Sequence, residues 1–111
     1  MCDDEYGIYP TAAVPNITRF EVTSNPVVGS DFFVRCSARG TPRPTISWKR
    51  DGNPLEPTED GVLRIVSTEN LMTSSVEVSD GRLEFNGVYE CIAMNPAGFA
   101  NRSSRIQLQG W

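Results

Sequence analysis

Histidine is absent from the 111 residues, and its absence removes the commonest catalytic and metal-binding arrangements. No serine–histidine or cysteine–histidine nucleophile and no zinc–histidine site can form without it. The carboxylate pairs Asp3-Asp4 and Glu59-Asp60 stand in polar segments, where we expect solvated side chains with unshifted pKa values. The sequence therefore predicts a protein that is not an enzyme and that holds no metal and no cofactor.

The sequence also has no block of basic residues and no long apolar run. Its ten Lys and Arg residues are scattered along the chain, and the formal net charge is −4. Nucleic acids and anionic membranes require a concentrated cationic surface, so neither is an expected partner. A membrane span needs about 18 consecutive apolar residues, so we expect no direct membrane insertion. The acidic start, Met1–Glu5, lacks the apolar run of a signal peptide, so a secreted parent would be longer than this chain.

Cysteine is scarce, with three residues in all, and their surroundings separate them into a pair and a remainder. Cys36 and Cys91 each lie in an apolar segment of alternating pattern, whereas Cys2 lies in a polar flank rich in Asp and Glu. The two internal cysteines are therefore the natural disulfide. Cys2 is predicted to be unpaired within the chain, either without a role or joined to a partner outside it.

Helical periodicity is missing too, and short alternating segments separated by Gly, Pro, Asn and Asp take its place. This pattern is typical of an all-β sandwich. The expected strands are Ile17–Val22, Phe32–Ala38, Thr45–Arg50, Val62–Val66, Leu71–Val78, Gly87–Met94 and Phe99–Leu108. The expected connections include Gly40–Pro44, Asp51-Gly52, Thr68-Glu69-Asn70, Asp80-Gly81 and Asn95–Gly98.

Two aromatic residues stand at informative distances from the cysteines. Trp48 follows Cys36 by 12 residues, and Tyr89 precedes Cys91 by two, so the strand phase turns all four side chains inward. An inward Trp on a neighbouring strand covers an inter-sheet disulfide, and an inward Tyr at that spacing can bond its hydroxyl to the preceding corner. These four residues form the expected core signature.

The segments around these residues resemble the I-set of the immunoglobulin superfamily. The resemblance lies in Cys36, in the run Gly40–Trp48 and in the run Asn86–Gly98, and it extends over about 15–109. It implies an all-β, Greek-key immunoglobulin-like β-sandwich with two antiparallel sheets and an inter-sheet disulfide. Residues 1–14 are expected to form a flexible N-terminal flank.

One residue departs from the usual pattern of this family. Members usually carry Asp two residues before the Gly of the Asp-x-Gly-x-Tyr-x-Cys motif, paired with an Arg, whereas this chain has Phe85 there. We therefore do not expect Arg64 to form that ion pair. The corner should instead have Leu83 or Phe85 packed beneath it.

Two further features concern the surface. Asn16 and Asn101 begin the sequons Asn-Ile-Thr and Asn-Arg-Ser and are candidate N-glycosylation sites. The strand phase also predicts an outward face with apolar anchors and a charged rim, which we treat as a candidate interaction face. Its members are Lys49, Glu90, Ile92, Met94, Phe99 and Arg105. A glycan on Asn101 would block part of this face, and scattered exposed apolar residues are the ordinary alternative.

The resemblance implies a non-catalytic protein–protein interaction module from a multidomain extracellular protein. A cell-surface receptor, an adhesion protein or a matrix protein would fit, located outside the cell or at its surface as part of an ectodomain. Its expected partners are proteins, with homophilic pairing as one option, and neighbouring domains of the same chain. The alternative is an intracellular I-set spacer or docking module of a muscle or cytoskeletal scaffold, with reduced cysteines. A third reading is a pure spacer without a partner.

Overall fold

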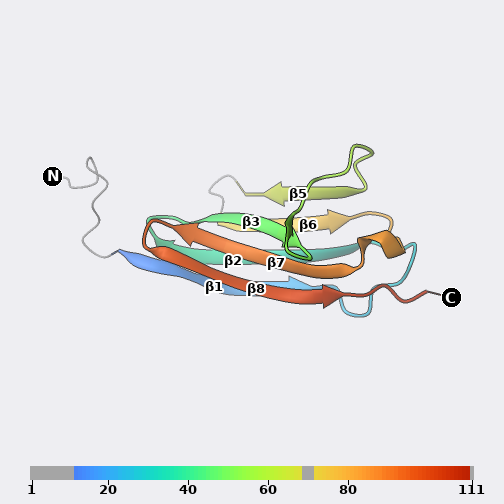
Figure 1. Cartoon of the computed structure of the whole chain (residues 1–111), viewed down its shortest axis with the longest axis horizontal. Helices are drawn as coiled ribbons and strands as arrows, with labels where there is room; N and C mark the ends of the chain where they lie inside the picture. Colours follow the sequence, from blue (N-terminus) through green and yellow to red (C-terminus); the bar gives the residue numbers. More distant parts are fainter. Residues whose placement is uncertain (1–11, 69–71, 111) are drawn as a thin grey trace.

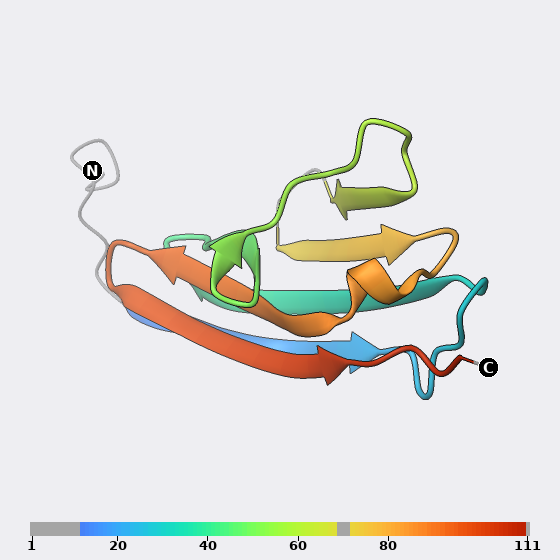
Figure 2. The same ribbon diagram turned by 45° about the vertical axis from the view of Figure 1, so that its right-hand side comes forward.

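Antiparallel pairing arranges the chain in two facing sheets, and the computed structural model describes residues 12–68 and 72–110 (Figure 1). One sheet has the order β1-β2-β6-β5 and the other the order β4-β3-β7-β8. The strands of the first sheet are β1 (Ala13–Val22), β2 (Phe32–Thr41), β6 (Thr73–Val78) and β5 (Leu63–Ser67). Those of the second are β4 (Asn53–Pro54), β3 (Thr45–Arg50), β7 (Gly87–Asn95) and β8 (Gly98–Ile106), and a 3-10 helix, η2 (Leu83–Phe85), precedes β7. The turned view of Figure 2 shows the two layers, with β8 running alongside β1.

The core lies between the sheets, where alternate residues of facing strands meet. On β2 the inward positions are fully buried and include Val34 and Cys36, whereas Phe33 and Arg35 lie on the outer side. Trp48, Tyr89 and Cys91 supply the other side of the core. The expected all-β sandwich is thus confirmed.

Strand boundaries differ from expectation mainly at the ends of the elements. β1 begins at Ala13, four residues before the expected start of that strand, because Ala13 pairs with Thr41 of β2. The pairing is irregular between Ala13 and Asn16, where Pro15 has no N–H to donate. The last strand ends at Ile106, two residues before the expected end at Leu108, although Leu108 is buried in the core. Cys2, Glu69, Asn70 and Leu71 lie outside the described residues, and so do the predictions that fall on them.

Asn95 closes the end of the sandwich at which β1 begins. Its side-chain amide donates hydrogen bonds to the carbonyl oxygens of Ala13 (2.9 Å) and Pro42 (2.8 Å). Its side-chain oxygen accepts from the backbone N–H groups of Ala97 (2.9 Å) and Gly98 (3.1 Å). One buried amide therefore fixes the first strand, the β2–β3 connection and the β7–β8 turn to one another.

Candidate functional site

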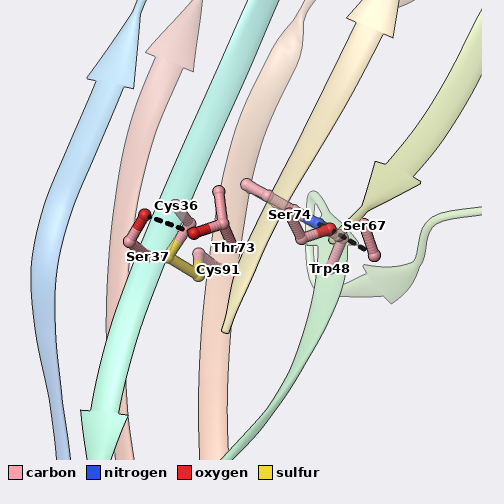
Figure 3. Close-up of a disulfide and its surroundings, with 7 residues drawn as sticks. All are labelled: Cys36, Ser37, Trp48, Ser67, Thr73, Ser74 and Cys91. Atoms are coloured by element: carbon pink, nitrogen blue, oxygen red, sulfur yellow. Dashed lines mark hydrogen bonds between the residues drawn. A yellow bond between two sulfur atoms is a disulfide. The ribbon is translucent and has the colours of Figure 1, made fainter. Parts of the chain in front are cut away.

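The two sheets are joined at their centre by a disulfide between Cys36 of β2 and Cys91 of β7. The sulfur atoms lie 1.96 Å apart and the Cα atoms 6.4 Å apart. Figure 3 shows the bridge crossing between the strands. The predicted pairing of the two internal cysteines is therefore confirmed.

Beside the disulfide runs a second link between the sheets, made by a hydrogen bond. Trp48 pairs in register with Cys91, and Ser74 of β6 pairs in register with Cys36. The Trp48 indole N–H donates to Ser74 Oγ over 2.9 Å, as Figure 3 shows, and Ser74 Oγ also bonds Ser67 Oγ at 3.1 Å. Trp48 thus connects the sheets as well as covering the sulfur bridge. Sequence reasoning missed Ser74, although a serine at an inward position of an alternating strand was the available signal.

Replacing Ser74 with alanine is expected to lower the free energy of unfolding by about 1–3 kcal/mol, because the buried indole N–H loses its acceptor. Urea unfolding followed by tryptophan fluorescence measures the change. Ser37→Ala is the matched control, since Ser37 also bonds a hydroxyl, Thr73 Oγ1 at 2.9 Å, but on the partly exposed outer side. Its cost should stay below about 1 kcal/mol. Equal costs in the two variants would contradict this role for Ser74.

The corner before β7 has the predicted tyrosine arrangement. The hydroxyl of Tyr89 donates to the Phe85 carbonyl over 2.6 Å. Phe85 is 4% exposed and joins the core, whereas Leu83, at the start of η2, is 61% exposed. Of the two residues considered for the space under the corner, Phe85 occupies it. Arg64 pairs instead with Glu77 at 3.1 Å.

Burial raises the pKa of Tyr89 above its ordinary value of 10.0, against a smaller opposing effect of the neighbouring Arg50. The unfolded chain therefore ionises first as pH rises through about 10, and above that pH it binds fewer protons than the folded chain. Stability from this source is present below pH 10 and falls above it. Tyr89→Phe should lose about 1–2 kcal/mol at neutral pH, with the corner hydrogen bond, and should show a shallower alkaline decline. Urea unfolding at several pH values tests this, and an unchanged alkaline slope would contradict it.

The six residues of the candidate interaction face lie on the outer side of the β3–β7–β8 sheet. Register pairs Lys49 with Glu90 between β3 and β7, and Met94 with Phe99 between β7 and β8. Ile92 lies between those two rows and pairs with Ser47 on one side and Asn101 on the other. Arg105 pairs with Val88 further along the same strands. The strand phase read from the sequence therefore agrees with where the structure places these residues.

This face is apolar toward one end and charged toward the other. Met94 is 54% exposed and Phe99 63%, so two large apolar side chains stand in solvent beside each other. Lys49 and Arg105 are also exposed, and the Asn101 amide donates to the Glu90 carboxylate over 2.6 Å. The candidate face therefore combines an exposed apolar pair with charged and polar residues beyond it.

Both sequon asparagines are exposed on strands, Asn16 on β1 and Asn101 on β8. Asn101 lies on the candidate face, whereas Asn16 lies on the opposite sheet. A glycan on Asn101 would therefore cover part of the face, and one on Asn16 would leave it open.

The described residues contain no group of His, Cys, Asp and Glu side chains that could bind a metal ion. The expectation of an unshifted pKa in the Glu59-Asp60 pair is wrong for Asp60, whose pKa is lowered chiefly by a hydrogen bond from the Thr58 side chain. The backbone N–H of Val62 also donates to this carboxylate, at 3.0 Å. Both bonds stabilise the charged form of an exposed group, which makes Asp60 a weaker base.

Among the described residues, the structure has no helix that is long and apolar enough to cross a membrane.

Comparison with known proteins gives the same family from sequence alone. The model of the immunoglobulin domain matches residues 15–95. Hemicentin-2 of Mus musculus is 34% identical over 95 residues, or 85% of this chain and 2% of that protein. The cell adhesion molecule DSCAM of Gallus gallus is 33% identical over 74% of the chain and 4% of its own length. The muscle M-line assembly protein unc-89 of Caenorhabditis elegans is 33% identical over 83% of the chain and 1% of its own length.

Solved structures that include immunoglobulin domains have the same fold as this chain. The Dscam1 Ig7 domain superposes with a TM-score of 0.75 at 27% identity, covering 86% of this chain and 96% of that domain. A chain from a mutant complex of titin M10 with an immunoglobulin domain of obscurin-like 1 superposes with a TM-score of 0.76 at 22% identity, covering 91% of this chain and 98% of that chain. That complex is an instance of immunoglobulin domains that bind proteins, including one another. The chain spans only 1–4% of the relatives named above, which include an adhesion protein and a muscle protein. The match over residues 15–95 and the bridged two-sheet core show that this chain belongs to the immunoglobulin domain family.

Proposed function

We propose that this domain is a non-catalytic protein-interaction module of a multidomain extracellular protein, either a cell-surface receptor, an adhesion protein or a matrix protein. The outer face of the β3–β7–β8 sheet would be its contact surface. The observation that carries the proposal is the exposed pair Met94 and Phe99, held side by side by the β7–β8 register. Rigid strands present these side chains, so little backbone conformational entropy is lost when a partner binds.

The arrangement around the apolar pair supports the same use. Interfaces concentrate their binding energy in a few central side chains, and a polar rim excludes water. Ile92 extends the apolar area toward the centre of the sheet, and Lys49, Glu90 and Arg105 supply charged groups beyond it. The rim would select and orient the partner, while the apolar residues would contribute most of the affinity.

Two observations favour an extracellular location. The Cys36–Cys91 disulfide is closed, and such bonds persist in oxidising compartments. Two exposed sequons are also available for N-glycosylation. The similarity to a protein named a cell adhesion molecule agrees with both.

The second candidate is an intracellular spacer or docking module of a muscle or cytoskeletal scaffold. It is favoured by the 33% identity to an M-line assembly protein.

The test that separates the two candidates is to produce the chain in a secretory host and to measure its mass before and after glycosidase treatment and thiol labelling. Our proposal predicts glycan on at least one sequon and labelling of Cys2 alone. A sugar-free product with both internal cysteines labelled would support the intracellular candidate instead.

Homophilic use of the face has its own test in sedimentation equilibrium. Ile92→Lys places a charge at the centre of the face and should weaken self-association through it by about tenfold or more. Val66→Lys is the matched control, since Val66 is 47% exposed on β5, in the opposite sheet. Unchanged association in the Ile92 variant would exclude homophilic pairing through this face.

A further inference from the structure

The two ends of the sandwich carry opposite charge. At the end where β1 begins, the exposed basic residues are Arg39 and Arg43, and the structure gives neither an ion pair within the described residues. We call this the basic end, formed by Val14, Arg39, Arg43, Met94 and Phe99. At the end where β8 stops, exposed carboxylates gather on the loops and on η2, and Arg82 pairs there with Asp80 at 3.7 Å and with Glu84 at 3.6 Å. We call this the acidic end, formed by Val27, Asp31, Asp80, Leu83 and Glu84.

Both ends also present apolar side chains to solvent. At the basic end the Val14 side chain lies against Gly98, because a Cβ added to Gly98 would come within 2.9 Å of Val14 Cγ1. Phe99 is the next residue along the chain after Gly98. At the acidic end Val27 and Leu83 are exposed on neighbouring segments. Those segments are joined by a backbone hydrogen bond of 2.8 Å from the Gly29 N–H to the Gly81 oxygen. Each end therefore combines exposed apolar side chains with a net charge, positive at the basic end and negative at the acidic end, where Asp31, Asp80 and Glu84 outnumber Arg82.

Hydrogen bonds fix both ends, which lie at opposite extremes of the molecule (Figures 1 and 2). Asn95 holds the basic end through its four bonds. At the acidic end the Gln109 N–H donates to the Pro26 oxygen, and the Val28 N–H donates to the Gln109 oxygen, both at 2.8 Å. The two surfaces are thus preorganised and face away from each other, so the basic end of a domain cannot contact the acidic end of the same domain.

We propose that the basic end binds the acidic end of a second copy of this chain, so that copies stack head to tail. Charge complementarity selects this pairing, because contact between two like ends would oppose Arg43 to Arg43 or Glu84 to Glu84. The contact is heterologous and does not close on itself, which makes the association open-ended. Met94 and Phe99 belong both to this end and to the proposed sheet face, so the variants below use residues that belong to only one surface.

Sedimentation equilibrium of the whole chain at several hundred micromolar tests the proposal. At about 0.05 M ionic strength the average mass should rise continuously with concentration, and at about 0.5 M the association should weaken. Arg43→Glu and Glu84→Arg should each weaken it by about tenfold. An equimolar mixture of the two variants should associate again, because each supplies an intact end and the reversed ends also match.

The controls separate the ends from other surfaces. Val66→Lys, at an exposed position of β5 outside both ends, should leave the salt-dependent association unchanged. Arg43 and Glu84 lie outside the proposed sheet face, so failure of that face and failure of this contact are distinguishable. Replacing Asp3, Asp4 and Glu5 with Asn, Asn and Gln should not abolish association, since these acids lie outside the acidic end. A salt-insensitive dimer of fixed size, a mixture that stays monomeric, or loss of association in the Asp3–Glu5 variant would overturn the proposal. Circular dichroism confirms that each variant is folded.

Discussion

Replacing Cys36 and Cys91 together with alanine is expected to lower the free energy of unfolding by about 4 kcal/mol. The bridge joins residues 55 positions apart, and a cross-link over a loop of that length removes much of the conformational freedom of the unfolded chain. Since domains of this size are stable by about 5–15 kcal/mol, the variant should be close to its unfolding limit at body temperature. Urea unfolding of the variant and of the parent chain, each at neutral pH, measures the difference.

Cys2→Ala is the matched control for this variant, because it removes a thiol without opening the bridge. Its unfolding midpoint should equal that of the parent chain. Adding reductant to the parent should reproduce most of the loss seen in the double variant. A loss below about 1 kcal/mol would contradict the structural importance of the bridge and would leave the Trp48–Ser74 hydrogen bond as the main link between the sheets.

Changing Phe85 to aspartate, the residue usual for the family at this position, is expected to destabilise this chain by more than about 3 kcal/mol. The Phe85 ring is almost fully buried, so its loss alone costs about 3–5 kcal/mol. A carboxylate in its place would also be drawn from water. Arg82, whose guanidinium carbon lies 5.8 Å from the centre of the Phe85 ring, already pairs with Asp60, Asp80 and Glu84, and Arg64 pairs with Glu77 on the outer side of the sheet. Thermal unfolding followed by circular dichroism gives the comparison.

Leu83→Asp provides the control within the same 3-10 helix. Leu83 is exposed, so its substitution should change stability by no more than about 0.5 kcal/mol. Phe85→Ala separates the loss of packing from the cost of the charge, and it should lie between the two aspartate variants. Wild-type stability in Phe85→Asp would mean that the corner can return to the usual ion pair, which contradicts the packing described above.

The sequence best predicted the features that depend on one local rule, the alternation of inward and outward side chains along a strand. Alternation in the segments around Cys36 and Cys91 turned both cysteines inward, and the spacing of Trp48 and Tyr89 placed them beside the bridge. The same rule gave the outward phase of Ile92 and its neighbours, because a strand cannot turn one residue without turning the rest.

The features that sequence did not predict depend on which polar groups meet across long separations. Ser74 accepts from Trp48 because β3 and β6, in different sheets, face each other at that level. Asn95 fixes Ala13 over a separation of 82 residues. Alternation identifies the inward side of a strand but not the partner on the facing sheet, so such pairs follow only from the assembled fold. For the same reason the extension of β1 to Ala13 was missed.

The disulfide, the Trp48–Ser74 bond and the tyrosine corner together hold the β3–β7–β8 sheet rigid while its outer face remains open. A rigid backbone beneath Met94 and Phe99 suits an interaction module, because ordering a flexible loop on binding would reduce affinity. The core signature is thus related to the proposed function, because the core contacts hold the two sheets together and the paired strands keep the outer face exposed.

The most direct test of that function is binding of a tetravalent form of the chain to a panel of cell surfaces, because multivalency makes weak contacts measurable. The parent chain and Val66→Lys should stain the same subset of cells. Ile92→Lys should stain it at least about tenfold more weakly. Equal staining by the Ile92 variant, or no staining by the parent chain across the panel, would contradict the assignment of the β3–β7–β8 face as a protein-binding surface.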